Sequence, residues 1–189
     1  MSEEILDMVE RIVRYTVFQC CPPRSSPEEW DFETLEQRFE TILSTKVDTS
    51  DFLDLRVPDI EEKIYYAVEG RWKKKQNELE SDFVVVDGDL VAKDEVPVHA
   101  KVKEPVWRFL LRQFYLGQID RHWRDHLTQM DHLRDGIGLR GYGSRDPKIE
   151  YKKEGHQLFS SMMREVDFNV LAEIFNVKLM SPDEVRREA

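Results

Sequence analysis

The chain has 189 residues, of which 40% are hydrophobic and 35% are charged, and its formal net charge is −10. This length suits one large domain or two small ones, and the apolar fraction is enough for a hydrophobic core. The acidic balance argues against nucleic acid as a partner, because the phosphate backbone attracts cationic surfaces. No apolar run reaches the roughly 18 residues of a membrane-spanning helix, and the first residues do not resemble a secretory signal.

The negative charge is concentrated in the first third of the chain. Residues 1–62 contain 6 Lys or Arg and 16 Asp or Glu, a net charge of −10, whereas residues 63–189 contain 22 of each. Residues 134–153 contain six basic and three acidic side chains and therefore carry +3. Neither GxxxxGK[ST] nor GxGxxG occurs, so the sequence predicts no nucleotide-hydrolysing site, no catalytic residue and no cofactor in this chain.

Cys20 and Cys21 are the two cysteines of the chain, and they are adjacent. A vicinal pair rarely forms a disulfide, and two thiols do not complete a zinc site. We therefore expect reduced, structural thiols in a cytoplasmic protein.

The first predicted helix covers residues 2–20, where apolar residues recur every three or four positions, and Pro22-Pro23 ends it. Ser26-Pro27-Glu28-Glu29 is typical of a helix start, with Ser26 as the cap. A short helix is expected to follow. Its inward side chains are Leu35, Phe39 and Ile42.

A second capping box at residues 59–62 predicts a helix from Asp59 to about Glu80. Its lysine run, residues 73–75, is interpreted as a solvated face rather than a binding patch. Residues 83–91 place β-branched side chains around an Asp87-Gly88 turn, which predicts a short hairpin within a β insertion at 81–104.

The longest predicted helix runs from Pro105 to Asp135 and carries a coiled-coil-like seam. The seam comprises Phe109, Leu116, Trp123, Met130 and Ile137, with Ile119, His126 and Leu133 at the offset position. A glycine-rich turn follows, and Asp146-Pro147 then predicts a returning helix. One face of that helix comprises Ile149, Lys152, His156, Phe159, Met163 and Val166. A last helical stretch, 168–177, is apolar enough to pack on a neighbour. The predicted fold is mainly α.

The tip between these two helices is the favoured functional segment. Leu139, Arg140, Tyr142 and Arg145 place apolar, aromatic and basic side chains on a loop that needs none for a core. We interpret them as a contact for an extended peptide, a channel mouth or anionic lipid headgroups. The alternative, that they fold back on the helix ends, stays open.

A metal-dependent enzyme is the least favoured hypothesis. His122 and His126 are four residues apart, a spacing that can hold zinc on one helix face. A zinc-protease motif needs Glu directly after the first histidine, where Trp123 stands. We expect a packed, hydrogen-bonded His126 and no metal site.

Four stretches closely resemble the SecA family, the motor ATPases of bacterial preprotein translocation. They are WRDHL at 123–127, MDHLRDGI at 130–137, LRGYGSRDP at 139–147 and EYKKEG at 150–155. CPP at 21–23 and EEWD at 28–31 resemble, more loosely, the end of the long scaffold helix and the start of the helical wing of that family. The resemblance covers about residues 1–80 and 105–180. The nucleotide-binding motor and the cysteine-rich tail of the family are missing, which implies a C-terminal piece of a longer protein.

The resemblance implies four segments. Residues 1–22 would end the scaffold helix, 23–104 would form the helical wing, 105–180 the two-helix finger of the helical scaffold, and 181–189 a tail. The fold it implies is mainly α, a helical wing plus a long antiparallel helical hairpin, and the hairpin near 83–91 would be an addition to the family pattern.

The resemblance also implies a role. The tip residues Leu139, Arg140, Tyr142 and Arg145 would contact the preprotein and the SecYEG channel. Part of the seam would face the nucleotide-binding domains of the same protein and help to restrain its ATPase, through Trp123, His126, Met130 and Arg134. The chain itself would be non-catalytic, since ATP and Mg would bind in the motor domains. The parent protein would be cytoplasmic and peripherally associated with the inner face of the cell membrane.

A second hypothesis of a different class stays open. The chain could act as a free-standing α-helical adaptor that binds a partner through its heptad face. An open reading frame that continues into a nucleotide-binding motor would favour the first hypothesis over this one.

Overall fold

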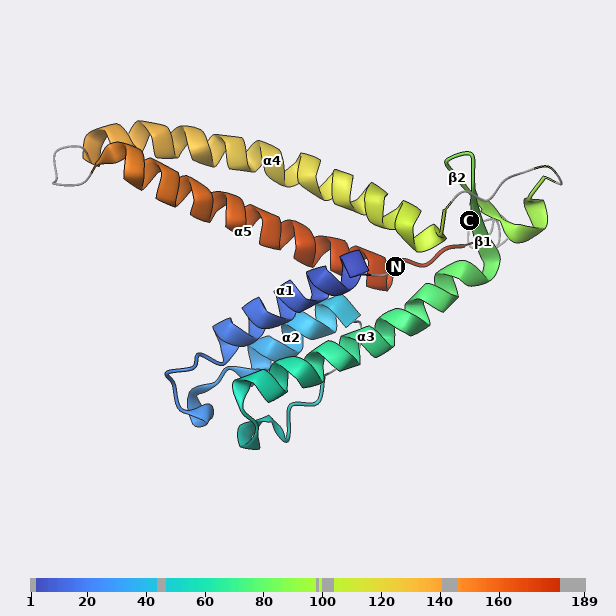
Figure 1. The fold of residues 1–189 in the computed structure, drawn as a ribbon, viewed down its shortest axis with the longest axis horizontal. Coiled ribbons are helices and arrows are strands. Elements are labelled where there is room, and N and C mark those ends of the chain that lie inside the picture. Colours follow the sequence, from blue (N-terminus) through green and yellow to red (C-terminus); the bar gives the residue numbers. More distant parts are fainter. Residues whose placement is uncertain (1–2, 44–46, 98, 100–103, 141–145, 181–189) are drawn as a thin grey trace. The chain divides into compact units, whose positions relative to one another are not determined.

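The computed structural model describes residues 3–43, 47–97, 99, 104–140 and 146–180. Its longer elements are helices, with one two-stranded antiparallel sheet (Figure 1). The predicted mainly α fold with a small β-hairpin is therefore confirmed. The chain divides into two units, of which unit 1 comprises Met1–Arg112 and Leu171–Ala189 and unit 2 comprises Gln113–Val170. None of the described helices combines the length and the apolar composition needed to cross a bilayer.

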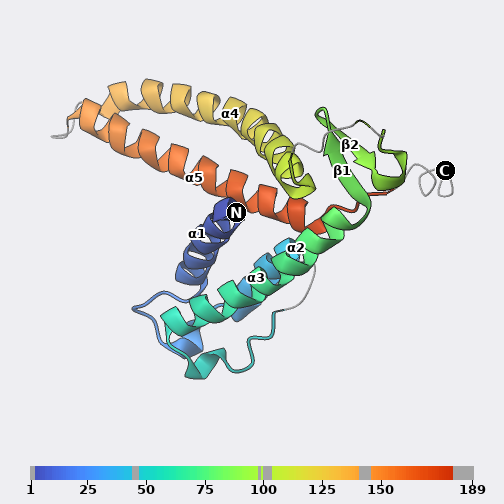
Figure 2. The same ribbon diagram turned by 45° about the vertical axis from the view of Figure 1, so that its right-hand side comes forward.

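Unit 1 begins with helix α1 (Glu3–Cys20), which matches the predicted helix closely. Its apolar residues recur every three or four positions and form one buried stripe, because that spacing returns side chains to the same helix face. The stripe packs against α2 and α3 (Figures 1 and 2). Both cysteines are buried as free thiols at the end of this helix, as expected.

Helix α2 (Phe32–Leu43) begins six residues after the predicted cap at Ser26. Ser26 does cap a helical turn, as predicted, and its amide donates a hydrogen bond to the Glu29 carboxylate at 3.2 Å. That turn is a single 3-10 turn, Pro27–Glu29, and it ends where Trp30 takes an extended conformation. The cap of α2 is Asp31, whose carboxylate accepts a hydrogen bond from the Thr34 amide at 2.9 Å. The three predicted inward side chains, Leu35, Phe39 and Ile42, are all buried.

Helix α3 (Val57–Asp82) begins two residues before the predicted start. Pro58 fits its first turn because proline lacks the amide hydrogen that this turn leaves unused. A short 3-10 turn, Phe52–Asp54, precedes it. The predicted solvated lysine face is correct for Lys73 and Lys74 but wrong for Lys75, which is only 5% exposed.

The predicted hairpin is confirmed as strands β1 (Phe83–Val86) and β2 (Asp89–Ala92), which pair Phe83 with Ala92 and Val86 with Asp89. Asp87 and Gly88 have φ values of 52° and 97°, the left-handed geometry that a two-residue hairpin turn requires. A 3-10 turn, Lys93–Glu95, follows β2.

The core of unit 1 also includes the start of α4 (Val106–Arg140) and the end of α5 (Pro147–Asn176). Trp72 of α3 is buried, and its ring lies 5.9 Å from that of Trp107 and 5.6 Å from that of Phe175. Asn176 donates a hydrogen bond to the Thr41 carbonyl at 2.9 Å. The predicted stretch 168–177 is helical as far as Asn176, where α5 ends, and its end packs on unit 1 residues, as expected.

Unit 2 consists of the remaining parts of α4 and α5, which run side by side in opposite directions (Figures 1 and 2). Helix α4 continues past its predicted end at Asp135, through two glycines, to Arg140. Ile137 is buried, and its packing offsets the roughly 1 kcal/mol by which each glycine disfavours a helix. Asp146 caps α5 through its carboxylate, which accepts a hydrogen bond from the Lys148 amide at 2.9 Å, as predicted.

Candidate functional site

The seam of α4 is only partly buried in the structure. His126 and Ile137 are buried, whereas Leu116 and Trp123 are exposed. Leu127 is also exposed, and it shares a helix face with Leu116 and Trp123 because positions four and seven residues apart return to the same side. Heptad spacing located these apolar residues correctly, but it did not show which of them pack inside unit 2.

Three ring side chains of unit 2 form a cluster that we call the aromatic patch: Trp123, His126 and Phe159. The His126 ring lies 5.4 Å from the ring of Trp123 and 5.9 Å from that of Phe159. His126 is 6% exposed, whereas Trp123 and Phe159 are each 42% exposed. The histidine thus forms the base of the patch, and the two larger rings present apolar surface to solvent.

His126 is packed, as expected, but the hydrogen bond predicted for it is not found among the described residues at its buried Nδ1 atom. His122 instead makes a side-chain contact, with its Nε2 3.0 Å from Nδ2 of Asn169. The two histidines therefore have different surroundings, since one lies among rings and the other against an amide. Among the described residues, no three His, Cys, Asp or Glu side chains are grouped to hold a metal ion.

Met130 of α4 packs closely against Gly155 of α5. A Cβ atom placed on Gly155 of α5 would lie 3.0 Å from the Met130 methyl carbon, so the glycine leaves room for that side chain. The predicted face of α5 is wrong in its first half, because Ile149, Lys152 and His156 are exposed. That half packs through Gly155 and Met162 instead.

Arg134, the last seam residue proposed for a partner contact, is exposed. Its guanidinium lies 3.2 Å from the Asp131 carboxylate and 3.5 Å from that of Asp135, and all three side chains are at least 66% exposed. Such surface pairs contribute little to stability, about 0–1 kcal/mol. The arginine is therefore available to a partner.

The predicted tip residues cannot be placed in the same way. Tyr142 and Arg145 lie outside the described residues. Leu139 and Arg140 belong by backbone to the last turn of α4, and their side chains lie outside the description.

Phe159 and Leu127 are candidate site residues that the sequence did not single out for this purpose. The spacing places Phe159 on the predicted packed face of α5, and the sequence predicts no role for Leu127. The available signal was the i, i+4 spacing from Trp123 to Leu127, which predicts a second apolar side chain on the outward face of α4.

Comparison with known proteins agrees with this architecture. The family model of the SecA Wing and Scaffold domain matches residues 1–178, so residues 81–104 lie inside the matched region. The protein translocase subunit SecA of Sorangium cellulosum is 35% identical over 191 residues, which cover 99% of this chain and 16% of that protein.

The protein translocase subunits SecA of Syntrophus aciditrophicus and Anaeromyxobacter sp. are 35% and 36% identical, over 98% and 94% of this chain. These matches cover 19% and 17% of the two relatives, so the chain spans less than a fifth of their length. The chain belongs to the SecA wing and scaffold domain family.

Proposed function

We propose that this chain is the non-catalytic wing and scaffold part of a SecA motor, which couples ATP hydrolysis in separate nucleotide-binding domains to movement of a preprotein through the SecYEG channel. The observation that carries this proposal is the family match across residues 1–178. The family match supports a role in protein translocation. The geometry of unit 2 supports the assignment of the aromatic patch, and the resemblance of residues 139–147 to the SecA family supports the assignment of the tip.

The aromatic patch is the proposed contact with the nucleotide-binding domain. Trp123 and Phe159 expose apolar surface although they belong to the longest helices of the chain, and large exposed rings are typical of interface hot spots. Arg134 is exposed on α4, the helix that carries Trp123, and Met130 of α4 packs against Gly155 of α5. Docking of this face would hold the motor in a restrained state, and its release would raise the ATPase rate.

The tip of the hairpin is the proposed contact with the preprotein and the channel. Two helices packed side by side form a stiff support, and each residue adds roughly 1.5 Å to the length of its helix. Tyr142 would supply an aromatic ring that contacts many sequences, and Leu139, Arg140 and Arg145 would flank it. The +3 charge of residues 134–153 also suits an anionic membrane surface.

The test uses a full-length SecA protein that contains this wing and scaffold. Tyr142→Ala should reduce protein translocation more than basal ATPase activity, and a photo-crosslinker at position 142 should capture a preprotein stalled in the channel. Equal loss of both activities, or crosslinks to the motor domain alone, would contradict the tip assignment.

The contact assigned to the aromatic patch has a separate readout. Trp123→Ala and Phe159→Ala should each raise the basal ATPase rate. Phe18→Ala is the matched control, because Phe18 is an exposed aromatic residue of α1 in unit 1. An unchanged ATPase rate in both patch variants would overturn the restraint.

A further inference from the structure

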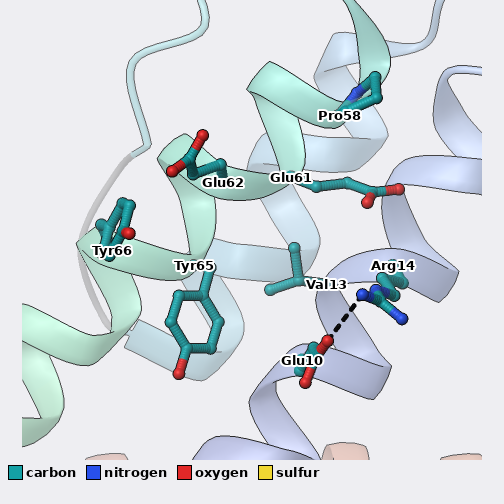
Figure 3. A pocket seen from close by; sticks show the side chains of 8 residues that line it. All are labelled: Glu10, Val13, Arg14, Pro58, Glu61, Glu62, Tyr65 and Tyr66. Carbon is teal, nitrogen blue, oxygen red and sulfur yellow. Dashed lines mark ion pairs between the residues drawn. The ribbon is translucent and has the colours of Figure 1, made fainter.

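A pocket in unit 1 lies between α1 and α3, and none of the residues proposed above for a functional contact lines it. Its volume is about 420 Å³, within the range of about 300–1,000 Å³ that is typical of ligand pockets. Its lining residues come from both helices: Glu10, Val13, Arg14, Pro58, Glu61, Glu62, Tyr65 and Tyr66 (Figure 3).

The pocket combines an apolar base with aromatic walls. Val13 is buried and belongs to the stripe through which α1 packs. Tyr65 and Tyr66 are adjacent on α3 and make an edge contact, with ring centroids 5.8 Å apart. Tyr66 is 57% exposed, so most of its ring is accessible to a ligand.

Carboxylates surround this apolar surface on both sides. Glu10 belongs to α1, and Glu61 and Glu62 belong to α3. With Arg14 as the opposing charge, the lining carries a net charge of −2, and it lies within the segment 1–62 that carries −10. Among the described residues, Glu61 and Glu62 have no ion-pair partner within 4.0 Å.

The negative charge around the pocket also affects the ionisation of Tyr65. Burial raises the pKa of the Tyr65 phenol above its ordinary value, and the charges of Glu69 and Glu10 raise it further. An added anion would be repelled here, whereas an added cation would be attracted.

Arg14 is a cation of the lining itself, and it pairs with one of the carboxylates. Its guanidinium lies 2.7 Å from a carboxylate oxygen of Glu10, and Figure 3 marks this ion pair within the pocket. A guanidinium can form two parallel hydrogen bonds with a carboxylate and can also stack on a tyrosine ring. Glu61 and Tyr65 are four residues apart on α3, as are Glu62 and Tyr66, so each carboxylate has a ring on the same helix face.

We propose that this pocket is a docking groove for an arginine-containing, extended segment of a second polypeptide. One arginine side chain of the partner stacks on the Tyr66 ring and pairs with the carboxylate of Glu62, which lies on the same side of α3 (Figure 3), and Glu61 adds to the negative charge of the lining. The charge of the lining selects a basic segment, and the rings select arginine over lysine, because ammonium does not stack as a plane.

The test measures binding of a short fluorescent Gly-Ser peptide that carries several arginines to the complete chain, by fluorescence anisotropy. The same peptide with lysines should bind several-fold more weakly, and the peptide with glutamates should not bind. The double variant Glu61→Gln, Glu62→Gln should weaken arginine-peptide binding about tenfold, through loss of an exposed ion pair with Glu62 and of the negative charge of Glu61. Tyr66→Ala should weaken it as well and should reduce the preference for arginine.

The matched control is the double variant Glu28→Gln, Glu40→Gln. It removes the same charge from exposed positions of the first third of the chain, outside the groove. If both double variants weaken binding of the arginine peptide equally, the overall negative charge of the segment attracts the peptide, and the proposal is wrong. Failure of the arginine peptide to bind would also overturn it. Self-association of the chain that the groove variant abolishes, measured by sedimentation velocity, would assign the groove to a second copy and overturn the choice of partner.

Discussion

The ammonium group of Lys75 donates a hydrogen bond to the Val177 carbonyl at 2.6 Å, although 102 residues separate the two in the chain. The same ammonium lies 3.3 Å from the Glu78 carboxylate. Val177 directly follows α5, and its carbonyl has no place in the regular hydrogen bonding of that helix. The buried ammonium group of Lys75 on α3 therefore supplies a hydrogen-bond donor to the carbonyl at the end of α5, within unit 1.

Replacement of this lysine should destabilise unit 1. Lys75→Met removes the donor and leaves the partly buried Val177 carbonyl without it, which costs about 1–3 kcal/mol. Urea unfolding followed by circular dichroism measures the change. Lys74→Met is the control, because Lys74 is exposed, and a change within about 0.5 kcal/mol is expected there. Equal effects of the two substitutions would contradict the role of Lys75.

Substitution of two glycines of unit 2, Gly155 and Gly117, should change its stability in opposite directions. Gly155→Leu places a side chain where Met130 already lies, and overpacking of this kind costs about 1–3 kcal/mol. Gly117→Ala meets no atom within 4 Å and should stabilise α4 by about 0.5–1 kcal/mol. Thermal unfolding of both variants measures the difference, and a stabilising Gly155→Leu would show that the helices are not close there.

Two tryptophans of similar chemistry should differ in their effect on stability. Trp72→Ala empties a site that is closed by Trp107 and Phe175 and should cost about 3–5 kcal/mol. Trp123→Ala removes a ring that is already 42% exposed, so its cost should be much smaller. The midpoint of urea unfolding distinguishes the two, and a larger loss for Trp123→Ala would place it in the core rather than on a contact surface.

The buried thiols should be unreactive in the folded chain. Burial, together with the neighbouring Cys20 and Asp31, raises the pKa of Cys21 from 9.0 to about 11. Because the thiolate is the reactive form, iodoacetamide should modify Cys21 at pH 8 only after unfolding. Mass spectrometry of the alkylated chain, native and in urea, provides the measurement. Rapid native alkylation would contradict the burial of Cys21.

The raised pKa of Cys21 also makes the stability of the folded chain depend on pH. The pKa of Cys21 is higher in the folded state than in the unfolded state, so its contribution to stability is complete below about pH 9. It decreases as the pH rises toward 11. The free energy of unfolding should therefore fall less between pH 9 and pH 11 in Cys21→Ala than in the unmodified chain. An equal fall in both would mean that other groups cause it.

Local patterns in the sequence determined the elements of this protein. The i, i+3, i+4 spacing of α1, the Asp87-Gly88 turn and the Asp146 cap each depend on neighbours within a few residues, so they could be read directly. The stretch from Trp123 to Gly155 was also sufficient to indicate the family. The start of α2 was predicted six residues too early because Asp31, and not Ser26, caps that helix. Helix α3 begins two residues before its predicted start, after Arg56, which makes no side-chain cap hydrogen bond.

Only the tertiary structure decided which apolar and charged residues are buried. Trp123 and His126 both lie on the seam of α4, yet one is exposed and the other is buried, because burial depends on where α5 lies. Lys75 belongs to a run of three lysines, and its burial follows from a carbonyl 102 residues away. The acidic groove required α1 and α3 to come together. Periodicity describes one helix at a time, whereas these features depend on pairs of helices that only folding brings into contact.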